Sequence, residues 1–252
     1  MSHPKVIRFD RQAGAALPAW PDIPAAQLES GTPRQSGITY FERPEIGLSA
    51  GIWECTAFIG KMEPYPVDEF MLVLEGEVTI AEPGGKQTTI RAGESFVLPR
   101  GLKCQWRQTG KMRKFFVIYE APAGAPTAPA AGLQVIKPDH RLVPQESSPS
   151  PAAETLIGPV PSQRSHSYYT DPSGQFTVGI WDTSYYHRKV VPFPRYELMC
   201  FLDGAVSMTD AAGSSETFNA GDSVFVPLGA PADFKVIGAY LRKIYVIFMP
   251  QA

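Results

Sequence analysis

The chain has 252 residues, enough for two domains of typical size, each with its own hydrophobic core. Its formal net charge of -2 offers no basic surface of the kind that binds nucleic acid or an anionic membrane. No apolar run reaches the roughly 20 residues of a membrane-spanning helix, and three cysteines without metal-site spacing fit a reducing, cytoplasmic location.

Many short strands are predicted, because 25 prolines and 22 glycines punctuate the chain and no helical periodicity persists. A short strand is expected at 5–10, then a loosely structured arm at 11–27. Further strands of the first half are expected at 36–41, 48–59, 69–81, 86–91, 94–98, 103–108 and 113–119. This spacing is typical of an all-β sandwich or barrel.

The same plan occurs twice. At a constant offset and without a gap, Gly51-Ile52-Trp53 aligns with Gly179-Ile180-Trp181, and Glu69 aligns with Glu197. Nearly a third of the aligned pairs are identical. A one-residue insertion then places Lys114 on Lys243. Near the starts of the two halves, the segment 6–10 is echoed by 135–139. A period this long indicates a duplicated domain and not a solenoid.

The stretch 62–104 carries a recognisable pattern: Glu69 six residues before Glu75-Gly76, then Gly93, five residues, Pro99, one residue and Gly101. This motif resembles that of the cupin family. The sequence of 68–78 is similar to the cupin subfamily that includes (S)-ureidoglycine aminohydrolase. The resemblance implies two tandem cupin barrels of the double-stranded β-helix or jelly-roll type, a bicupin. Expected domains are 1–120 and 133–252, joined by an Ala/Pro-rich linker at 121–132.

The resemblance also implies a metal site, since cupins that catalyse reactions usually hold a divalent metal with three His and the Glu of the first motif. In this chain every such His is replaced, and only Glu69 and Glu197 are kept. The corresponding positions hold Met62 and Pro64 (or Glu63 and Tyr65), Val190 and Pro192 (or Val191 and Phe193), Cys104 and Ala232. No metal cofactor is therefore expected. One alternative stays open: a divalent metal in the first barrel, bound by Glu63, Glu69 and Cys104, with Gln108 nearby. Cys104 as a small buried hydrophobe is the other interpretation.

A buried carboxylate without a metal needs another counter-charge. Strand alternation places Lys114 in an apolar row with Phe116, and Lys243 in one with Tyr245. We therefore expect Lys114 to pair with Glu69 and Lys243 with Glu197 inside the barrels. The alternative is that these lysines point to solvent.

Aromatic residues at or beside the lost ligand positions are expected to line the mouths of the barrels. The candidate ligand-pocket residues are Tyr65, Glu69, Cys104, Trp106, Lys114, Phe193, Glu197 and Lys243. No catalytic residue is assigned.

Three functions remain open. The first is a metal-independent cupin that binds a small molecule. The second is a metal-dependent hydrolase similar to ureidoglycine aminohydrolase. The third is a metal-free epimerase or lyase that uses Glu69 and Lys114. Neither nucleic acid nor membrane is expected as a partner. The strand 69–74 is apolar on both faces, and each face needs a cover. We expect the second face to pack against the sister cupin or a second subunit, the latter in a homodimer; sheets sealed by their own loops are the alternative.

Overall fold

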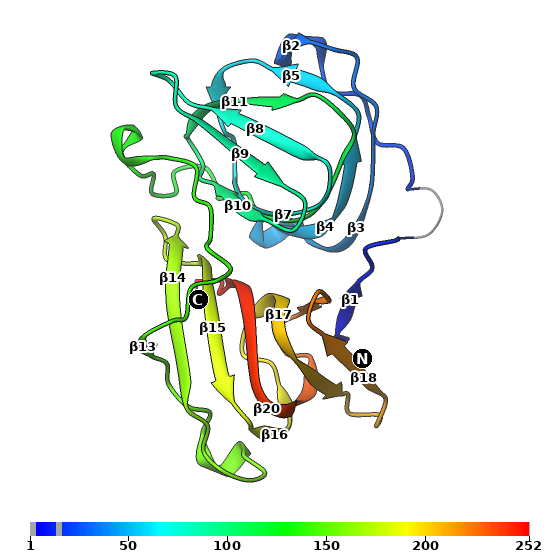
Figure 1. Ribbon diagram of the computed structural model, residues 1–252, viewed down its shortest axis with the longest axis vertical. Coiled ribbons are helices and arrows are strands. Elements are labelled where there is room, and N and C mark those ends of the chain that lie inside the picture. The colour runs from blue at the N-terminus through cyan, green and yellow to red at the C-terminus, as the bar shows by residue number, and fades with distance from the viewer. Residues whose placement is uncertain (1–3, 14–16, 252) are drawn as a thin grey trace. The chain divides into compact units, whose positions relative to one another are not determined.

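The computed structural model describes residues 4–13 and 17–251, and strands make up nearly all of its regular structure (Figure 1). The helical segments in this described part are single 3-10 turns at Ala25–Gln27, Pro44–Ile46, Ala130–Gly132 and Ala153–Thr155. The described helices are all too short to cross a membrane. The all-β prediction is confirmed.

The first barrel contains Asp10–Pro138 with the loop Asp171–Gly174, and is built from two sheets. One sheet has the order β10-β7-β12-β4-β3, and the other β2-β5-β11-β8-β9 with β6 paired to β11. The bounds are β2 Leu28–Ser30, β3 Gln35–Arg43, β4 Leu48–Cys55, β5 Phe58–Gly60, β6 Glu63–Pro64, β7 Asp68–Glu75, β8 Glu77–Ala81, β9 Gln87–Arg91, β10 Ser95–Leu98, β11 Lys103–Gln108 and β12 Met112–Tyr119. The expected strands at 48–59 and 69–81 are thus each divided into two.

In the second barrel, the described residues form one sheet in the order β1-β19-β17-β20-β15-β14-β13, with β16 on β20 and β18 on β17. The bounds are β1 Ile7–Phe9, β13 Glu146–Ser147, β14 Gln163–Thr170, β15 Phe176–Ser184, β16 His187–Pro192, β17 Tyr196–Thr209, β18 Ser215–Asn219, β19 Ser223–Val226 and β20 Pro231–Phe248. Strand β17 covers the positions of both β7 and β8, so one continuous strand serves both layers.

The turn between the two layers requires glycine at matching places. Gly76 and Gly204 have φ of 76° and 77°, in the left-handed region that favours glycine. A Cβ on Gly76 would lie 2.2 Å from the Lys111 carbonyl oxygen, and one on Gly204 would lie 2.2 Å from that of Tyr240. The duplicated Glu-x6-Gly spacing therefore fixes where each inner strand leaves the layer that carries its glutamate.

The segment that opens each repeat pairs with the barrel of the other repeat, as a strand in the second barrel and as a single β-bridge in the first. Strand β1 (Figure 1) pairs antiparallel with β19, and Ile7 lies opposite Phe225. At the equivalent place in the first barrel, Ile136 forms a bridge with Val97, through backbone hydrogen bonds of 2.8 and 3.1 Å. This exchange differs from the boundaries expected at residues 120 and 133: 7–9 group with the second barrel, and 121–138 with the first.

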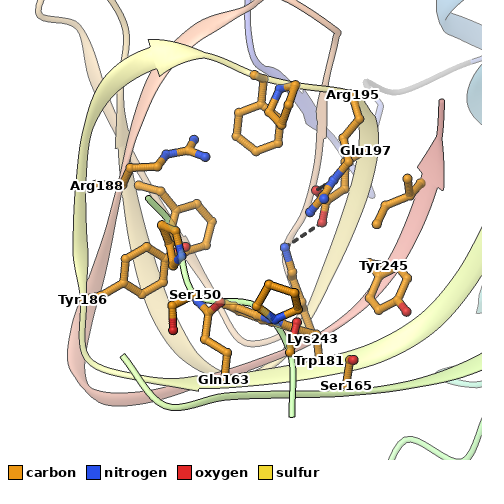
Figure 2. A pocket seen from close by; sticks show the side chains of 17 residues that line it. Ser150, Gln163, Ser165, Trp181, Tyr186, Arg188, Arg195, Glu197, Lys243 and Tyr245 are labelled. Carbon is orange, nitrogen blue, oxygen red and sulfur yellow. Dashed lines mark hydrogen bonds and ion pairs between the residues drawn. The ribbon is translucent and has the colours of Figure 1, made fainter. Parts of the chain in front are cut away.

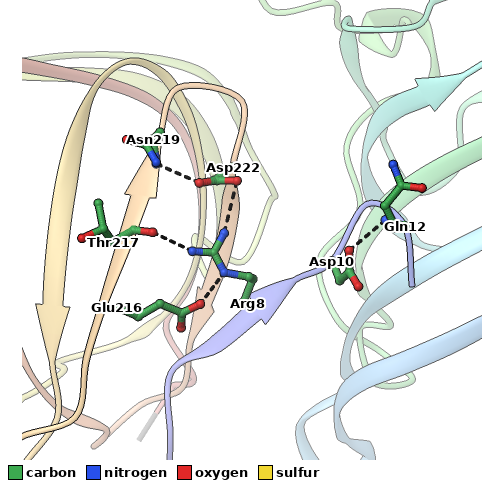
Figure 3. A network of polar contacts seen from close by, with 7 residues as sticks. All are labelled: Arg8, Asp10, Gln12, Glu216, Thr217, Asn219 and Asp222. Atoms are coloured by element: carbon green, nitrogen blue, oxygen red, sulfur yellow. Dashed lines mark hydrogen bonds and ion pairs between the residues drawn. The ribbon is translucent and has the colours of Figure 1, made fainter. Parts of the chain in front are cut away.

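Arg8 fastens the exchanged strand to its host barrel (Figure 3). Its Nη2 donates to the Thr217 carbonyl at 2.6 Å, its Nη1 lies 3.1 Å from Asp222 Oδ1, and its Nε donates to Glu216. The guanidinium also lies 4.3 Å from the centre of the Phe218 ring. Because the barrels exchange strands, neither half of the chain contains a complete barrel.

Two expectations from the sequence concern the arm at 11–27, expected to be loosely structured, and the central strand β7, whose second face was expected to need a cover. Of the arm at 11–27, residues 14–16 lie outside the described part. Trp20 is held by a 2.9 Å hydrogen bond from its N–H to the Gln35 carbonyl and packs edge-on against Phe116. In β7 both faces are buried within the single chain, since Phe70 and Met71 are each 0% exposed. A second subunit is thus not needed to bury them, and the homodimer stays a prediction.

Candidate functional site

A buried ion pair lies inside the first barrel. Glu69, near the start of β7, is 4% exposed, and Lys114 on β12 is 6% exposed. Lys114 Nζ lies 2.7 Å from Glu69 Oε1 and 2.9 Å from Met71 Sδ. Alternation along β7 directs Glu69 and Met71 to the same face, as the sequence pattern indicated. The predicted pairing of Lys114 with Glu69 is confirmed.

Tyr65 completes this site. Its hydroxyl donates a short hydrogen bond to Glu69 Oε2, the carboxylate oxygen that Lys114 does not contact. Burial, and then the charge of Glu69, raise the pKa of Tyr65 well above its usual value, so the phenol stays protonated. Lys114 Nζ also lies 4.9 Å from the Trp53 ring centre and 5.1 Å from that of Trp106. The ammonium thus has a carboxylate and two aromatic faces around it.

Two cavities adjoin this pair. The larger has a volume of about 490 Å³, and the candidate pocket residues Tyr65, Cys104, Trp106 and Lys114 contribute to its lining. The smaller, about 230 Å³, is bordered by Glu69 and by Trp20 of the arm. Burial raises the pKa of the Cys104 thiol to about 11, so this cysteine remains protonated at neutral pH.

The residues present do not fit a divalent metal. Glu63 is exposed on β6, and Cys104 packs in an apolar cluster that includes Met71 and Val135. Gln108 donates instead to the Cys55 carbonyl at 2.7 Å. Among the described residues, no three His, Cys, Asp or Glu side chains come together as a possible metal site. The open alternative, with Glu63, Glu69 and Cys104 as ligands, is therefore not formed, and both Glu69 oxygens are engaged by other donors.

The second barrel repeats the ion pair with a different second donor. Glu197 is 1% exposed, and Lys243 Nζ lies 2.7 Å from its Oε1. Arg195 Nε donates to Oε2 at 2.9 Å. Burial by itself would raise the pKa of Glu197, but the charges of Arg195 and Lys243 outweigh it and lower the pKa to about 2. The predicted pairing of Lys243 with Glu197 is confirmed, and this carboxyl group is ionised at neutral pH.

A cavity of about 310 Å³ lies beside this pair (Figure 2). The candidate pocket residues Phe193, Glu197 and Lys243 lie in its wall. Arg188 on β16 points into the same cavity and is a residue that the sequence analysis did not identify. Arg195 was missed as well. It lies two residues before Glu197, so period-two alternation would have placed both side chains on one face. For Arg188 the sequence held no such signal, since Gly60 stands at the equivalent position of the first half.

Comparison with protein families then identifies the fold. Residues 44–116 and 170–245 match the model of the EutQ-like cupin domain, and together they form more than half of the chain. The chain belongs to the EutQ-like cupin family. The predicted pair of cupin barrels is therefore confirmed, one barrel for each matched stretch. No curated protein matches this cupin chain.

Solved structures of similar fold match nearly the whole length of the chain. A protein of unknown function of the DUF861 family from Pseudomonas syringae pv. tomato str. DC3000 is 28% identical, with a TM-score of 0.79 over 97% of this chain and 99% of that one. A cupin 2 conserved barrel domain protein from Leptotrichia buccalis is 11% identical, with a TM-score of 0.60 over 99% and 98%. The protein Ylba from E. coli, also of the DUF861 family, is 11% identical, with a TM-score of 0.56 over 100% and 94%.

Proposed function

We propose that this bicupin binds small molecules inside its barrels without a metal, with a lysine ammonium as the counter-charge of each motif glutamate. One observation carries the proposal: in both barrels a buried lysine Nζ lies 2.7 Å from the glutamate carboxylate. The ion pair neutralises the carboxylate and leaves no oxygen of Glu69 or Glu197 free of a strong donor.

The cavities support binding of a small molecule. Volumes of about 490 and 310 Å³ lie within the range of roughly 300–1,000 Å³ that is usual for small-molecule pockets. Trp53 and Trp106 line the first, and Trp181 and Phe234 line the second. Aromatic walls with a few convergent polar groups are the common composition of such pockets.

The test is elemental analysis of the full-length, untagged protein, combined with a thermal-shift screen of small molecules. The metal content is counted before and after incubation with manganese, iron, nickel or zinc. We expect no stoichiometric metal under any of these conditions, and a rise in melting temperature with at least one organic compound. About one tightly bound ion per chain would contradict the proposal and would favour a hydrolase similar to ureidoglycine aminohydrolase.

A second candidate function is metal-free acid–base chemistry, such as an epimerase or lyase reaction, in the first barrel. The observation that favours it is the Tyr65–Glu69–Lys114 cluster next to the larger cavity. There Lys114 and Tyr65 are proton donors held by one carboxylate. Activity of the metal-free protein that is lost in Tyr65→Phe, with the fold retained, would establish this function over binding alone.

The proposal also includes the cellular location and the oligomeric state of the protein. A cytoplasmic location is supported by Cys55, Cys104 and Cys200, which are all buried and free of disulfides. A homodimer is proposed as well, and because the central strands are already buried within one chain, sedimentation of the purified protein decides it.

A further inference from the structure

The cavity of the second barrel carries an excess of positive charge. Arg188, Arg195 and Lys243 line it, against the single carboxylate of Glu197. Both oxygens of Glu197 are engaged, one by Lys243 and the other by Arg195. The cavity lining therefore contains no carboxylate that is left to balance Arg188.

One further carboxylate acts on Arg188 from outside the lining. The negative charge of Asp233 attracts the Arg188 guanidinium. The Asp233 oxygens, however, make their hydrogen bonds with other residues. Oδ2 lies 3.2 Å from His187 Nε2, and Oδ1 accepts the backbone N–H of Thr209. Asp233 therefore makes no hydrogen bond to Arg188, and the guanidinium keeps its donors for another acceptor.

The donors of Arg188 that lack a partner share one edge of its planar guanidinium. Nε and Nη2 are both buried, and neither makes a hydrogen bond. The guanidinium lies 4.8 Å from the centre of the Phe193 ring, which also lines the cavity. A buried donor without an acceptor costs free energy. A fork of two parallel N–H groups matches the two oxygens of a carboxylate.

We propose that the second barrel binds a small organic carboxylate, with its two oxygens on the Nε–Nη2 edge of Arg188 and its apolar part against Phe193 and Phe234. The proposal rests on the small-molecule-binding function proposed above and names its ligand class. Arg195 and Lys243 add attraction for an anion, although their main partner is Glu197. The cavity volume of about 310 Å³ is at the lower end of the usual range and suits a compact ligand.

The first barrel serves as an internal comparison. The place of Arg188 is taken there by Gly60, and that of Arg195 by Val67. The charged residues around its two cavities balance, with Lys61 and Lys114 against Glu63 and Glu69. The excess positive charge is therefore a property of the second barrel and not of the duplicated plan.

The test is isothermal titration calorimetry on the full chain at neutral pH and low salt, with paired probes. Acetate, pyruvate and benzoate are each compared with their primary amides, which have nearly the same shape but no charge, and inorganic phosphate is added as a second type of anion. The variants are Arg188→Gln, which removes the charge, and Arg188→Lys, which keeps the charge but loses the fork. Lys235→Gln is the matched control, because this exposed lysine on β20 lies outside the cavity lining.

At least one carboxylate is expected to bind roughly tenfold to hundredfold more tightly than its amide, the usual effect of a hydrogen-bonded charge. Arg188→Gln should remove this preference, Arg188→Lys should keep part of it, and Lys235→Gln should behave as wild type. Melting temperatures without ligand verify that each variant is folded.

Equal affinity for carboxylates and amides, or an unchanged preference in Arg188→Gln, would overturn the proposal. Phosphate binding more tightly than every carboxylate would overturn the assignment to carboxylates. If neutral or cationic compounds bind and carboxylates do not, the proposed small-molecule function stands and only this inference fails. If no compound binds at all, both fail.

Discussion

The two barrels keep the same lysine–glutamate pair but differ in the group that binds the second carboxylate oxygen. In the first barrel that group is the neutral hydroxyl of Tyr65, and in the second it is the guanidinium of Arg195. Phe193 stands at the position of Tyr65 and has no hydroxyl to donate. The duplicated fold therefore keeps the neutralisation of each glutamate, whereas the total charge around it differs.

This difference indicates which part of the site is structural and which part is open to specialisation. A buried carboxylate must be neutralised in either barrel, so the lysine at the shared position of the last strand stabilises the fold. The residues at the positions of Arg188 and Arg195 have no such constraint, since Gly60 and Val67 serve in the first barrel. Two cations added on the same framework change a balanced pocket into a positively charged one.

Removal of the carboxylate should have the largest effect on the free energy of unfolding, and the loss should differ between the two barrels. Glu197→Gln leaves Lys243, Arg195 and Arg188 together in a cavity whose lining then contains no carboxylate. We expect a loss of about 5 kcal/mol in the free energy of unfolding, near the upper end for broken buried pairs. Glu69→Gln leaves only Lys114 and should cost about 3 kcal/mol. Urea unfolding of the two variants at neutral pH measures both, and equal losses would contradict the charge difference.

Removal of the lysine should reverse that order. Lys114→Met leaves the buried Glu69 with only the hydroxyl of Tyr65 as a partner, at an expected cost of about 4 kcal/mol. Lys243→Met leaves Arg195 bound to Glu197, so the loss should be less than half as large. Urea unfolding again provides the measurement. Unchanged stability in Lys114→Met would refute the structural role of the pair.

Much of this arrangement could be predicted from the sequence, because duplication and alternation act together. Glu69 and Glu197 recur at one offset, and Lys114 and Lys243 recur in matching apolar rows, so each lysine was expected to face its glutamate. A polar residue that recurs in two otherwise apolar strands can be placed without a structure, since the same side of the sheet is buried in both.

Other features could not be predicted for definite physical reasons. The echo of 6–10 in 135–139 marks two equivalent strands, but no residue in them specifies which of two similar barrels each joins. Arg188 has no counterpart in the first barrel, and β16 has a register shift between Arg188 and Val191 that breaks the regular alternation. A side chain in such a strand is placed by the contacts of the folded barrel and not by its spacing.

The stability of the second barrel should decrease in acid, because Glu197 becomes protonated. Its pKa is about 2 in the folded chain, below the ordinary value of 4.5, so the unfolded chain binds this proton more readily. The stabilisation is therefore fully present above pH 4.5 and is lost as the pH falls towards 2, by about 3 kcal/mol in total. Unfolding free energies measured from pH 6 to pH 2.5 test this. Glu197→Gln, which cannot titrate, should have a flatter profile, and parallel profiles would contradict the assignment.

Substitution of Arg188 should have the smallest effect on stability, and this effect should be a gain and not a loss. Its Nε and Nη2 are buried without partners, so the free protein bears a cost that a bound carboxylate would offset. Arg188→Met keeps an apolar stem against Phe193 and removes the unpaired charge, and we expect the ligand-free protein to gain about 1 kcal/mol. The measurement is the urea midpoint without ligand, with Lys235→Gln as a control for simple loss of surface charge. A loss of stability in Arg188→Met would mean that the guanidinium already has favourable partners in the free barrel. A gain would mean that this arginine is kept at the expense of stability, as residues of binding sites commonly are.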